Sequence, residues 1–323
     1  MAKVVIGARL PGRIDQILAG HEIVRPAEPE AELPRARLTE ALRDAEGLLT
    51  LLKVRIDDAL LDGAPRLRVV ANYAVGYDNV DLAATARRGI VVTNTPDVLT
   101  DATADLTMTL MLAAARRLPE GGAMLREGRW RGWEPEQLPA MDLGGAQLGI
   151  VGLGRIGQAV ARRARGFGMR VVYTQRSAAT AEVEAATGAR RVALDELVAT
   201  SDVVTLHAPA TAETRHLMDA ARIAQMKPRA VLVNTARGAL VDEAALAAAL
   251  DRGHLLGVGL DVFEDEPRVH PALAASPRAV LMPHLGSSTV GTRTAMAELA
   301  AQSIADVLAG RRPANVVSAP GSH

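Results

Sequence analysis

The sequence predicts an α/β protein made of two lobes, each built on a parallel sheet. Short apolar runs alternate along the whole chain with Ala-rich segments of helical periodicity, the order that parallel strands and crossover helices produce. The 323-residue chain is also long enough for two hydrophobic cores, and its hydrophobic content of 49% can fill them. Two series of strands supply the two sheets.

The first series of strands covers the N-terminal third of the chain. Its apolar runs are bounded by polar and turn-forming residues, so we expect buried strands with helices in the gaps. Pro96 disfavours helix at Thr95, so the series ends there. The expected strands are Val4–Ile6, Gly47–Leu52, Val69–Ala71 and Ile90–Thr93, and the expected helices lie near Leu38–Ala45 and Leu82–Arg88.

A long helix and an irregular connection lead to the second series. Thr100 or Asp101 is suited to cap a helix from Ala102 to about Leu118. The stretch 127–143 holds two tryptophans and two prolines, and we expect an irregular connection there. We expect residues 313–323 to form a surface tail. The second series of strands comprises Gln147–Val151, Met169–Tyr173, Val203–His207, Ala230–Asn234, Leu256–Leu260 and Ala279–Met282.

Composition excludes several classes of function. Lys plus Arg and Asp plus Glu both number 37, and this balance argues against a broad surface for nucleic acid or anionic lipid. The chain has no cysteine, which excludes disulfides and zinc–thiolate sites, and we expect no metal. The apolar run Leu106–Ala115 is about half the length that spans a bilayer, and the run at Val4 is too short for a signal peptide. We therefore expect a cytoplasmic protein without nucleic-acid or membrane partners.

A glycine loop follows the first strand of the second series. The strand runs directly into Gly152-Leu-Gly154-Arg-Ile-Gly157 and then into a helical pattern. Strand, GxGxxG and helix in this order predict a dinucleotide site, although the bare motif is weak. Gly152 permits the tight turn, Gly154 lets the backbone approach a pyrophosphate, and Gly157 lets helix and strand pack closely. The helix N-terminus supplies N–H donors for the phosphates.

The segment Thr174-Gln175-Arg176-Ser177 follows the next strand and should lie beside the adenosine ribose. NAD-preferring sites usually carry Asp or Glu there, and this segment has neither. Arg176 adds a charged partner for a 2′-phosphate. We therefore expect NADP(H) to be preferred and NAD(H) to be possible. The alternative is that Arg176 is a solvated surface residue.

Three polar groups follow the ends of successive later strands, namely Arg237, Glu266 and His284. Ligands of open parallel sheets bind outside the carboxyl ends of strands, so these groups can converge. Arg237 can hold a carboxylate through a bidentate fork, His284 can donate a proton to a carbonyl oxygen, and Glu266 can orient the imidazole. Each residue alone has an ordinary structural explanation. Together, downstream of a dinucleotide loop, they predict hydride transfer to a small 2-keto acid.

The chain resembles the D-isomer-specific 2-hydroxyacid dehydrogenases over essentially its whole length, and within that family it is most similar to glyoxylate/hydroxypyruvate reductases. The similarity to this subfamily depends on fewer features than the similarity to the family. They are Arg165–Arg170, Trp133 and the segment Thr174–Ser177 beside the expected ribose, here called the ribose segment. The segments that carry the family resemblance are Ala74–Asp81, Thr93–Pro96, Val98–Thr100, Ala102–Asp105, Gly152–Gly157, Asn234–Gly238, Gly259–Glu266 and Pro283–Ser287.

The resemblance implies roles for individual residues. Arg237, Glu266 and His284 would be catalytic, and the backbone amides of Val75 and Gly76 would bind the substrate carboxylate. Lys53 ends a predicted strand, and it could contact substrate or be solvated. The further cofactor contacts that the resemblance implies are Thr103, Arg155, Ile156, Ala236 and Asp261. The alternative for Asp261 is that it is a buried hydrogen-bond anchor.

The resemblance also implies the architecture, with two Rossmann-like, doubly wound parallel-sheet lobes and the active site in the cleft between them. The substrate-binding lobe would comprise residues 1–99 and 287–323, and the dinucleotide-binding lobe residues 100–286. The helix from Ala102 would help to build a homodimer, although an ordinary core explains its all-round apolar pattern nearly as well.

Other functions remain alternatives at this stage. Dehydrogenases acting on D-lactate, phosphoglycerate, formate or phosphite share the scaffold, and the length of 323 residues counts against the larger phosphoglycerate type. A nucleotide-sensing corepressor can keep the same fold. The intact set of Arg237, Glu266 and His284 disfavours the corepressor.

Overall fold

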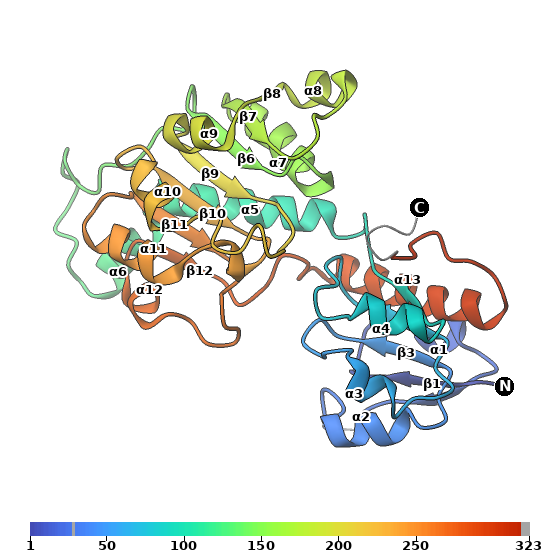
Figure 1. Cartoon of the computed structure of the whole chain (residues 1–323). Helices are drawn as coiled ribbons and strands as arrows, with labels where there is room; N and C mark the ends of the chain where they lie inside the picture. The colour runs from blue at the N-terminus through green and yellow to red at the C-terminus, as the bar shows by residue number, and fades with distance from the viewer. Residues whose placement is uncertain (28–29, 318–323) are drawn as a thin grey trace. The chain divides into compact units, whose positions relative to one another are not determined.

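The computed structural model describes residues 1–27 and 30–317 and divides the chain into two compact units (Figure 1). The first unit consists of Met1–Leu99 and the C-terminal segment that begins at Ser288, and the second consists of Thr100–Ser287. These boundaries lie within one residue of the expected ones. Residues 318–323 of the expected substrate-binding lobe lie outside the described residues.

The first unit is a five-stranded parallel sheet in the order β2-β1-β3-β4-β5. Alternate side chains of each strand face opposite sides of the sheet. Val5 and Leu48 belong to the apolar cluster that the sheet shares with α2, α3 and α4. Val4 and Leu49 belong to the apolar cluster on the other face, which the sheet shares with α1 and α13. The elements are β1 (Lys3–Ile6), α1 (Ile14–Ile17), β2 (Glu22–Val24), α2 (Arg35–Ala41), β3 (Gly47–Thr50), α3 (Asp58–Leu61), β4 (Val69–Asn72), α4 (Leu82–Arg87), β5 (Val91–Thr93) and α13 (Val290–Leu308).

The second unit is a seven-stranded parallel sheet in the order β12-β11-β10-β9-β6-β7-β8. Its elements are α5 (Thr100–Ala115), α6 (Leu118–Arg126), β6 (Gln147–Val151), α7 (Arg155–Gly166), β7 (Arg170–Thr174), α8 (Ala181–Thr187), β8 (Ala189–Arg191), α9 (Leu194–Thr200), β9 (Val203–Leu206), α10 (Ala220–Gln225), β10 (Val231–Asn234), the 3-10 turn η1 (Gly238–Leu240), α11 (Glu243–Asp251), β11 (Gly257–Leu260), α12 (Pro271–Ala275) and β12 (Ala279–Leu281).

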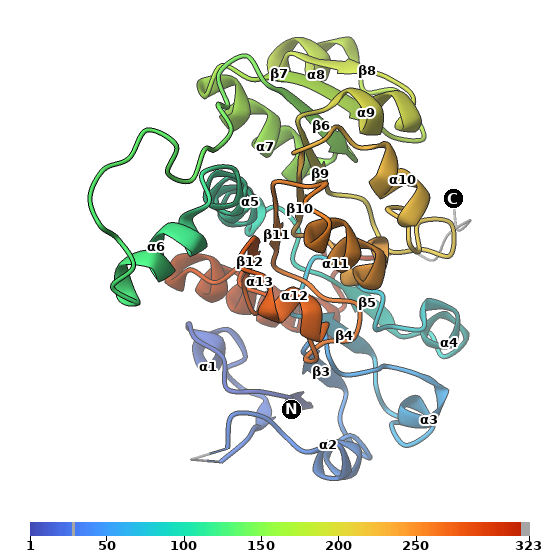
Figure 2. The ribbon, with the colours of Figure 1, turned by 90° about the vertical axis from the view of Figure 1, so that its left-hand side faces the viewer.

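Helices cover both faces of the second sheet, which confirms the doubly wound architecture. Helices α5 and α7 share one apolar cluster with the sheet, and α9, α10, α11 and α12 share the other. Figure 2 shows α5 and α7 on one side of β6, β9 and β10, and α10 and α11 on the other. The strand order reverses between β6 and β9, so the loops that follow these strands form the switch point at which such folds bind ligands.

Helix α5 packs within its own unit. It starts at Thr100, so the expectation that Thr100 or Asp101 caps the helix is wrong, because both residues already lie inside it. Leu110 of α5 contacts Gly259 of β11 so closely that a Cβ on this glycine would lie 2.7 Å from the Leu110 Cβ. The core of the second unit therefore explains the apolar pattern of α5. No helix within residues 1–27 and 30–317 has both the length and the apolar character needed to cross a membrane.

Two edge strands were not predicted from the sequence. Strand β2 has the sequence Glu-Ile-Val and β8 has the sequence Ala-Arg-Arg, so neither is an apolar run. Each lies at the edge of its sheet, where one side has no neighbouring strand among the described residues. Charged residues on edge strands oppose pairing with other chains, which is the physical reason for their polar composition.

The expectation of a surface tail from residue 313 is partly wrong. The N–H of Val317 donates to the carbonyl of Val92 (2.8 Å), and the N–H of Asn94 donates to the carbonyl of Asn315 (3.3 Å). Thr93 and Val316 form an antiparallel bridge. Residues 315–317 therefore pair with the outer edge of β5, and residues 318–323 lie outside the described residues.

Candidate active site

The glycine loop follows β6 and opens α7. Gly152 has φ +96°, and a Cβ there would lie 2.7 Å from the carbonyl oxygen of His207, so this turn requires glycine. A Cβ on Gly157 would lie 2.2 Å from the Gly152 carbonyl oxygen, because helix and strand approach closely here. A Cβ on Gly154 would meet nothing within 4 Å. This loop fits a dinucleotide, since open space lies beside Gly154 at the start of a helix of 12 residues.

The ribose segment follows β7, which ends at Thr174. The side chain of Gln175 accepts the N–H of Leu153 in the glycine loop (3.0 Å). Arg176 is exposed. The guanidinium of Arg191 donates to the carbonyls of both Gln175 and Arg176 (2.9 Å each). Sequence reasoning missed Arg191 because the edge strand that carries it was not predicted.

Glu266 and His284 form a hydrogen-bonded pair. The His284 Nδ1 and the Glu266 Oε2 lie 3.0 Å apart, and the Glu266 Oε1 accepts the N–H of Phe263 (3.1 Å). Burial raises the pKa of Glu266, but the His284 and Phe263 hydrogen bonds and the charges of His284 and Arg237 outweigh it. The pKa of this carboxyl therefore lies below its usual value. An ionised carboxylate is what can hold an imidazolium in place.

Arg237 lies just beyond β10, close enough for its charge to lower the pKa of Glu266. The side chain of Asn234, which is buried, donates to the Arg237 carbonyl (2.8 Å) and accepts the N–H of Ala236 (3.0 Å). One guanidinium N–H of Arg237 donates to the Ala236 carbonyl (2.8 Å). The structure thus brings Arg237, Glu266 and His284 to the same edge of the second sheet.

The loops that carry Arg237 and Glu266 pack backbone against backbone. A Cβ on Gly238 would lie 1.8 Å from the carbonyl carbon of Phe263, so only glycine permits this contact. The buried carboxylate of Glu243 accepts the N–H of Glu264 (2.7 Å). These contacts fix the two loops against each other.

Asp261 anchors the loop of His284. Its carboxylate, only 1% exposed, accepts the N–H groups of Leu285 (2.6 Å) and Gly286 (2.8 Å). Its carbonyl accepts the N–H of His284 (2.9 Å), whose φ is +56°. Burial raises the pKa of Asp261, and the two N–H groups partly oppose that rise. These contacts support the alternative in which Asp261 is a hydrogen-bond anchor.

The other predicted cofactor residues lie near these loops. The hydroxyl of Thr103, which is buried, donates to the carbonyl of Gly286 (3.2 Å) and so contacts the His284 loop. Arg155 and Ile156 lie in the first turn of α7, directly after the glycine loop, and Ile156 packs against the apolar cluster under α5 and α7. Their contacts with a cofactor stay predictions.

Of the predicted substrate residues, Arg237 lies in the second unit, and the other three lie in the first unit, beyond the carboxyl ends of two strands. Val75 and Gly76 follow β4, and Lys53 follows β3. The Lys53 ammonium lies 2.6 Å from a carboxylate oxygen of Glu32, and 63% of its side chain is exposed. This surface ion pair supports the alternative in which Lys53 is solvated.

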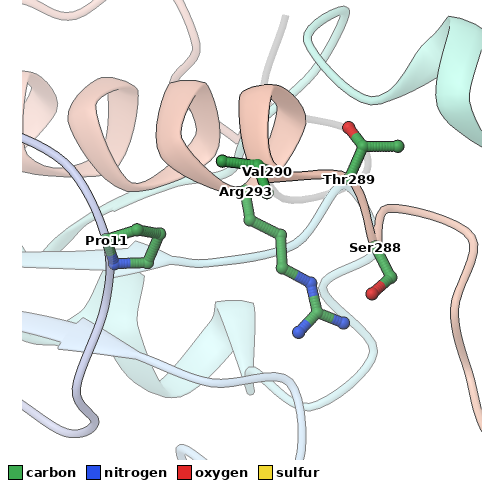
Figure 3. Close-up of a pocket in the computed structure, with 5 residues that line it drawn as sticks. All are labelled: Pro11, Ser288, Thr289, Val290 and Arg293. Atoms are coloured by element: carbon green, nitrogen blue, oxygen red, sulfur yellow. The ribbon is translucent and has the colours of Figure 1, made fainter.

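The first unit also contains a hollow of about 270 Å³ (Figure 3). It is lined by Pro11, Ser288, Thr289, Val290 and Arg293, and none of these is a predicted site residue. In the described part of the chain, no group of three or more His, Cys, Asp or Glu side chains is arranged to hold a metal ion.

Comparisons with known proteins match both the second unit and the whole chain. The model of the D-isomer specific 2-hydroxyacid dehydrogenase NAD binding domain matches residues 108–286. The chain is 47% identical to a glyoxylate reductase of Thermococcus onnurineus, over 98% of this chain and 96% of that protein. A crystal structure of a protein from Thermus thermophilus is 47% identical with a TM-score of 0.90, covering 98% of this chain and 99% of that one.

A further solved structure carries bound cofactor. It is the NADPH-dependent glyoxylate/hydroxypyruvate reductase of Sinorhizobium meliloti, in complex with NADP and malonate. Its TM-score is 0.84 at 36% identity, and the match covers 98% of this chain and 96% of that one.

The lowered pKa of Glu266 predicts a pH-dependent contribution to stability. A carboxyl whose folded pKa is depressed stabilises the fold above its ordinary pKa of 4.5, and this contribution is lost as the pH falls through the folded value. We expect Glu266→Gln to lower the free energy of unfolding more at neutral pH than at about pH 4. Urea unfolding at both pH values measures the difference. An equal loss at both would contradict the lowered pKa of Glu266.

Proposed function

This chain belongs to the D-isomer-specific 2-hydroxyacid dehydrogenase family, and we propose that glyoxylate and hydroxypyruvate are the 2-keto acids it reduces. It is an oxidoreductase that converts a small 2-keto acid to a D-2-hydroxy acid with a nicotinamide cofactor. The relatives named glyoxylate reductases are 47% and 48% identical to this chain over 98% of its length, and this high identity favours glyoxylate over D-lactate, phosphoglycerate, formate or phosphite. The proposal includes a cytoplasmic location.

The observation that carries the proposal is the Glu266–His284 pair beside Arg237. In our assignment, His284 gives a proton to the carbonyl oxygen of the substrate, and Glu266 holds the imidazole through Nδ1 so that Nε2 faces the substrate. Arg237 binds the substrate carboxylate. The backbone amides of Val75 and Gly76 bind a carboxylate as well. This set of an acid, its orienting carboxylate and an anion clamp disfavours a corepressor.

The glycine loop Gly152–Gly157 would hold the pyrophosphate of the cofactor, with Arg155 and Ile156 in the first turn of α7. Thr103 and Ala236 are assigned further contacts with the cofactor, and Asp261 is assigned to anchor the His284 loop. When bound, the reduced nicotinamide supplies the hydride. The second unit is thus assigned to binding the cofactor, while Val75 and Gly76 of the first unit are assigned to binding substrate.

We propose that NADP(H) is preferred over NAD(H). The segment from Thr174 to Ser177 has no carboxylate to hold the ribose hydroxyls. Arg176 is exposed at its end, and Arg191 adds a second guanidinium on the carbonyls of the same segment. A 2′-phosphate would meet positive charge here.

We also propose a homodimer formed through α6 and residues 127–143. Helix α6 has no buried residue, and its large apolar side chains Leu118 and Leu125 are 59% and 62% exposed. In the connection that follows, Trp130 is 51% and Trp133 is 82% exposed. Such a run of exposed large apolar side chains is typical of an interface between copies of a chain. This surface replaces the helix from Ala102, which packs in the core of its own unit.

The proton-donor assignment predicts the effect of His284→Asn. Loss of the acid should slow reduction of glyoxylate by roughly 100-fold or more, while the affinity for NADPH stays close to that of the wild type. Steady-state kinetics and a fluorescence titration of NADPH measure the two quantities. His21→Asn, in the first unit, is the matched control. Turnover by His284→Asn at the wild-type rate would reject this assignment.

The cofactor proposal predicts that Arg176→Gln selectively impairs NADPH. Loss of one charge-assisted hydrogen bond corresponds to about a tenfold fall in kcat/KM for NADPH, with kcat/KM for NADH nearly unchanged. Arg190→Gln, an exposed arginine of β8 paired with Glu196, is the control. A wild-type enzyme with higher kcat/KM for NADH than for NADPH would refute the preference.

The dimer proposal predicts twice the chain mass of 34.0 kDa in light scattering. A double variant, Leu125→Glu with Trp133→Arg, should shift the mass toward the monomer, because charge is placed on the apolar surface. Val290→Asp changes another exposed apolar residue, in the first unit, and should leave the dimer intact. A wild-type monomer would contradict the proposal.

A further inference from the structure

In the loop after β4, three consecutive carbonyls accept hydrogen bonds from other residues of the first unit. The Ala74 carbonyl accepts the N–H of Thr95 (2.9 Å), the Val75 carbonyl accepts the side-chain amide of Asn94 (2.8 Å), and the Gly76 carbonyl accepts that of Asn72 (2.8 Å). Two of the three donors are therefore asparagine side chains.

The orientation of these carbonyls sets that of the neighbouring N–H groups. The peptides of this loop are trans, and the C=O and N–H of a trans peptide point in opposite directions. The N–H groups of Val75, Gly76 and Tyr77 are thus directed away from the three donors. Within residues 1–27 and 30–317, none of these three N–H groups has a hydrogen-bond acceptor. A row of such groups is an arrangement that binds anions.

Both asparagines are themselves held in place. Asn72 is fully buried, and its amide pairs reciprocally with that of Asn79 (3.1 and 3.2 Å). The Asn79 side-chain N–H also donates to the Val54 carbonyl (3.0 Å). This bond determines the orientation of the Asn79 amide, because only its nitrogen can donate to a carbonyl. The Asn94 carbonyl accepts the side-chain amide of Asn315. These contacts leave the loop carbonyls little freedom to rotate.

We propose that Asn72 and Asn94 are positioning residues for substrate recognition. By holding the Gly76 and Val75 carbonyls, they present the N–H groups of Val75, Gly76 and Tyr77 to the carboxylate of a 2-keto acid. The inference rests on the proposed function and extends it, because it adds the Tyr77 N–H as a donor and assigns the loop conformation to two side chains.

A purely structural role makes a different prediction. If Asn94 only filled space and donated to a carbonyl, its truncation to Ala would raise KM for glyoxylate more than the isosteric Asn94→Asp would. If it orients the Val75–Gly76 peptide, Asn94→Asp is worse for substrate binding, because a carboxylate oxygen facing the Val75 carbonyl repels it and turns the peptide. The order of the two variants therefore separates the explanations.

The experiment measures KM for glyoxylate, KM for NADPH and Tm in Asn94→Asp, Asn94→Ala and Asn72→Asp. We expect Asn94→Asp and Asn72→Asp to raise KM for glyoxylate at least about tenfold, with KM for NADPH within about twofold of the wild type, since binding of one ligand is lost. Asn94→Ala should raise KM for glyoxylate less than Asn94→Asp. Gln16→Glu makes the same amide-to-carboxylate change at an exposed residue of α1 in the first unit, and should leave KM for glyoxylate within about twofold.

Calorimetric binding of oxalate, an unreactive carboxylate ligand, keeps this inference separate from the proposed function. A wild-type protein that reduces no 2-keto acid would contradict the proposed function. Weaker oxalate binding by Asn94→Asp than by the wild type would still support the binding of a carboxylate by the N–H groups of the loop after β4. The inference is overturned if Asn94→Asp leaves both KM for glyoxylate and oxalate affinity unchanged. It is also overturned if Asn94→Ala or Gln16→Glu raises KM for glyoxylate as much as Asn94→Asp does.

Discussion

The buried carboxylate of Asp261 is the interaction on which the rest of the candidate site depends. It binds two consecutive N–H groups, and the carbonyl of the same residue binds the N–H of His284. These bonds hold His284 in a left-handed conformation that a residue with a Cβ rarely adopts, and which costs of the order of 1 kcal/mol or more. The hydrogen bond between His284 and Glu266 therefore relies on main-chain contacts made by a third residue.

Side chains also hold the backbone of two other loops that follow strands, those after β10 and β4. Loop carbonyls and N–H groups have no sheet or helix partner, so other donors and acceptors must satisfy them. Asn234 does this for the loop of Arg237, and Asn72 and Asn94 do it for the loop of Val75 and Gly76. Asparagine side chains thus determine where the backbone groups of both loops point.

The sequence predicted the parts of this protein that depend on local pattern. Apolar runs located the central strands, and the glycine spacing located the dinucleotide loop. It did not predict β2 or β8, because polar edge strands lack an apolar run, nor the contact of Arg191 with the ribose segment. The partners of Asn72 and Asn94 depend on how distant segments fold together. The apolar pattern of α5 could not separate burial in its own unit from burial against another copy.

The pairing of residues 315–317 with β5 has a consequence for how the chain avoids aggregation. An open sheet exposes unpaired N–H and C=O groups along its outermost strand, where a second molecule can add its own strand. In this protein Val317 and Asn315 occupy part of that position on β5. The terminal segment thus acts as a protective cover, and trimming the chain before Asn315 would bare a template for intermolecular strand addition.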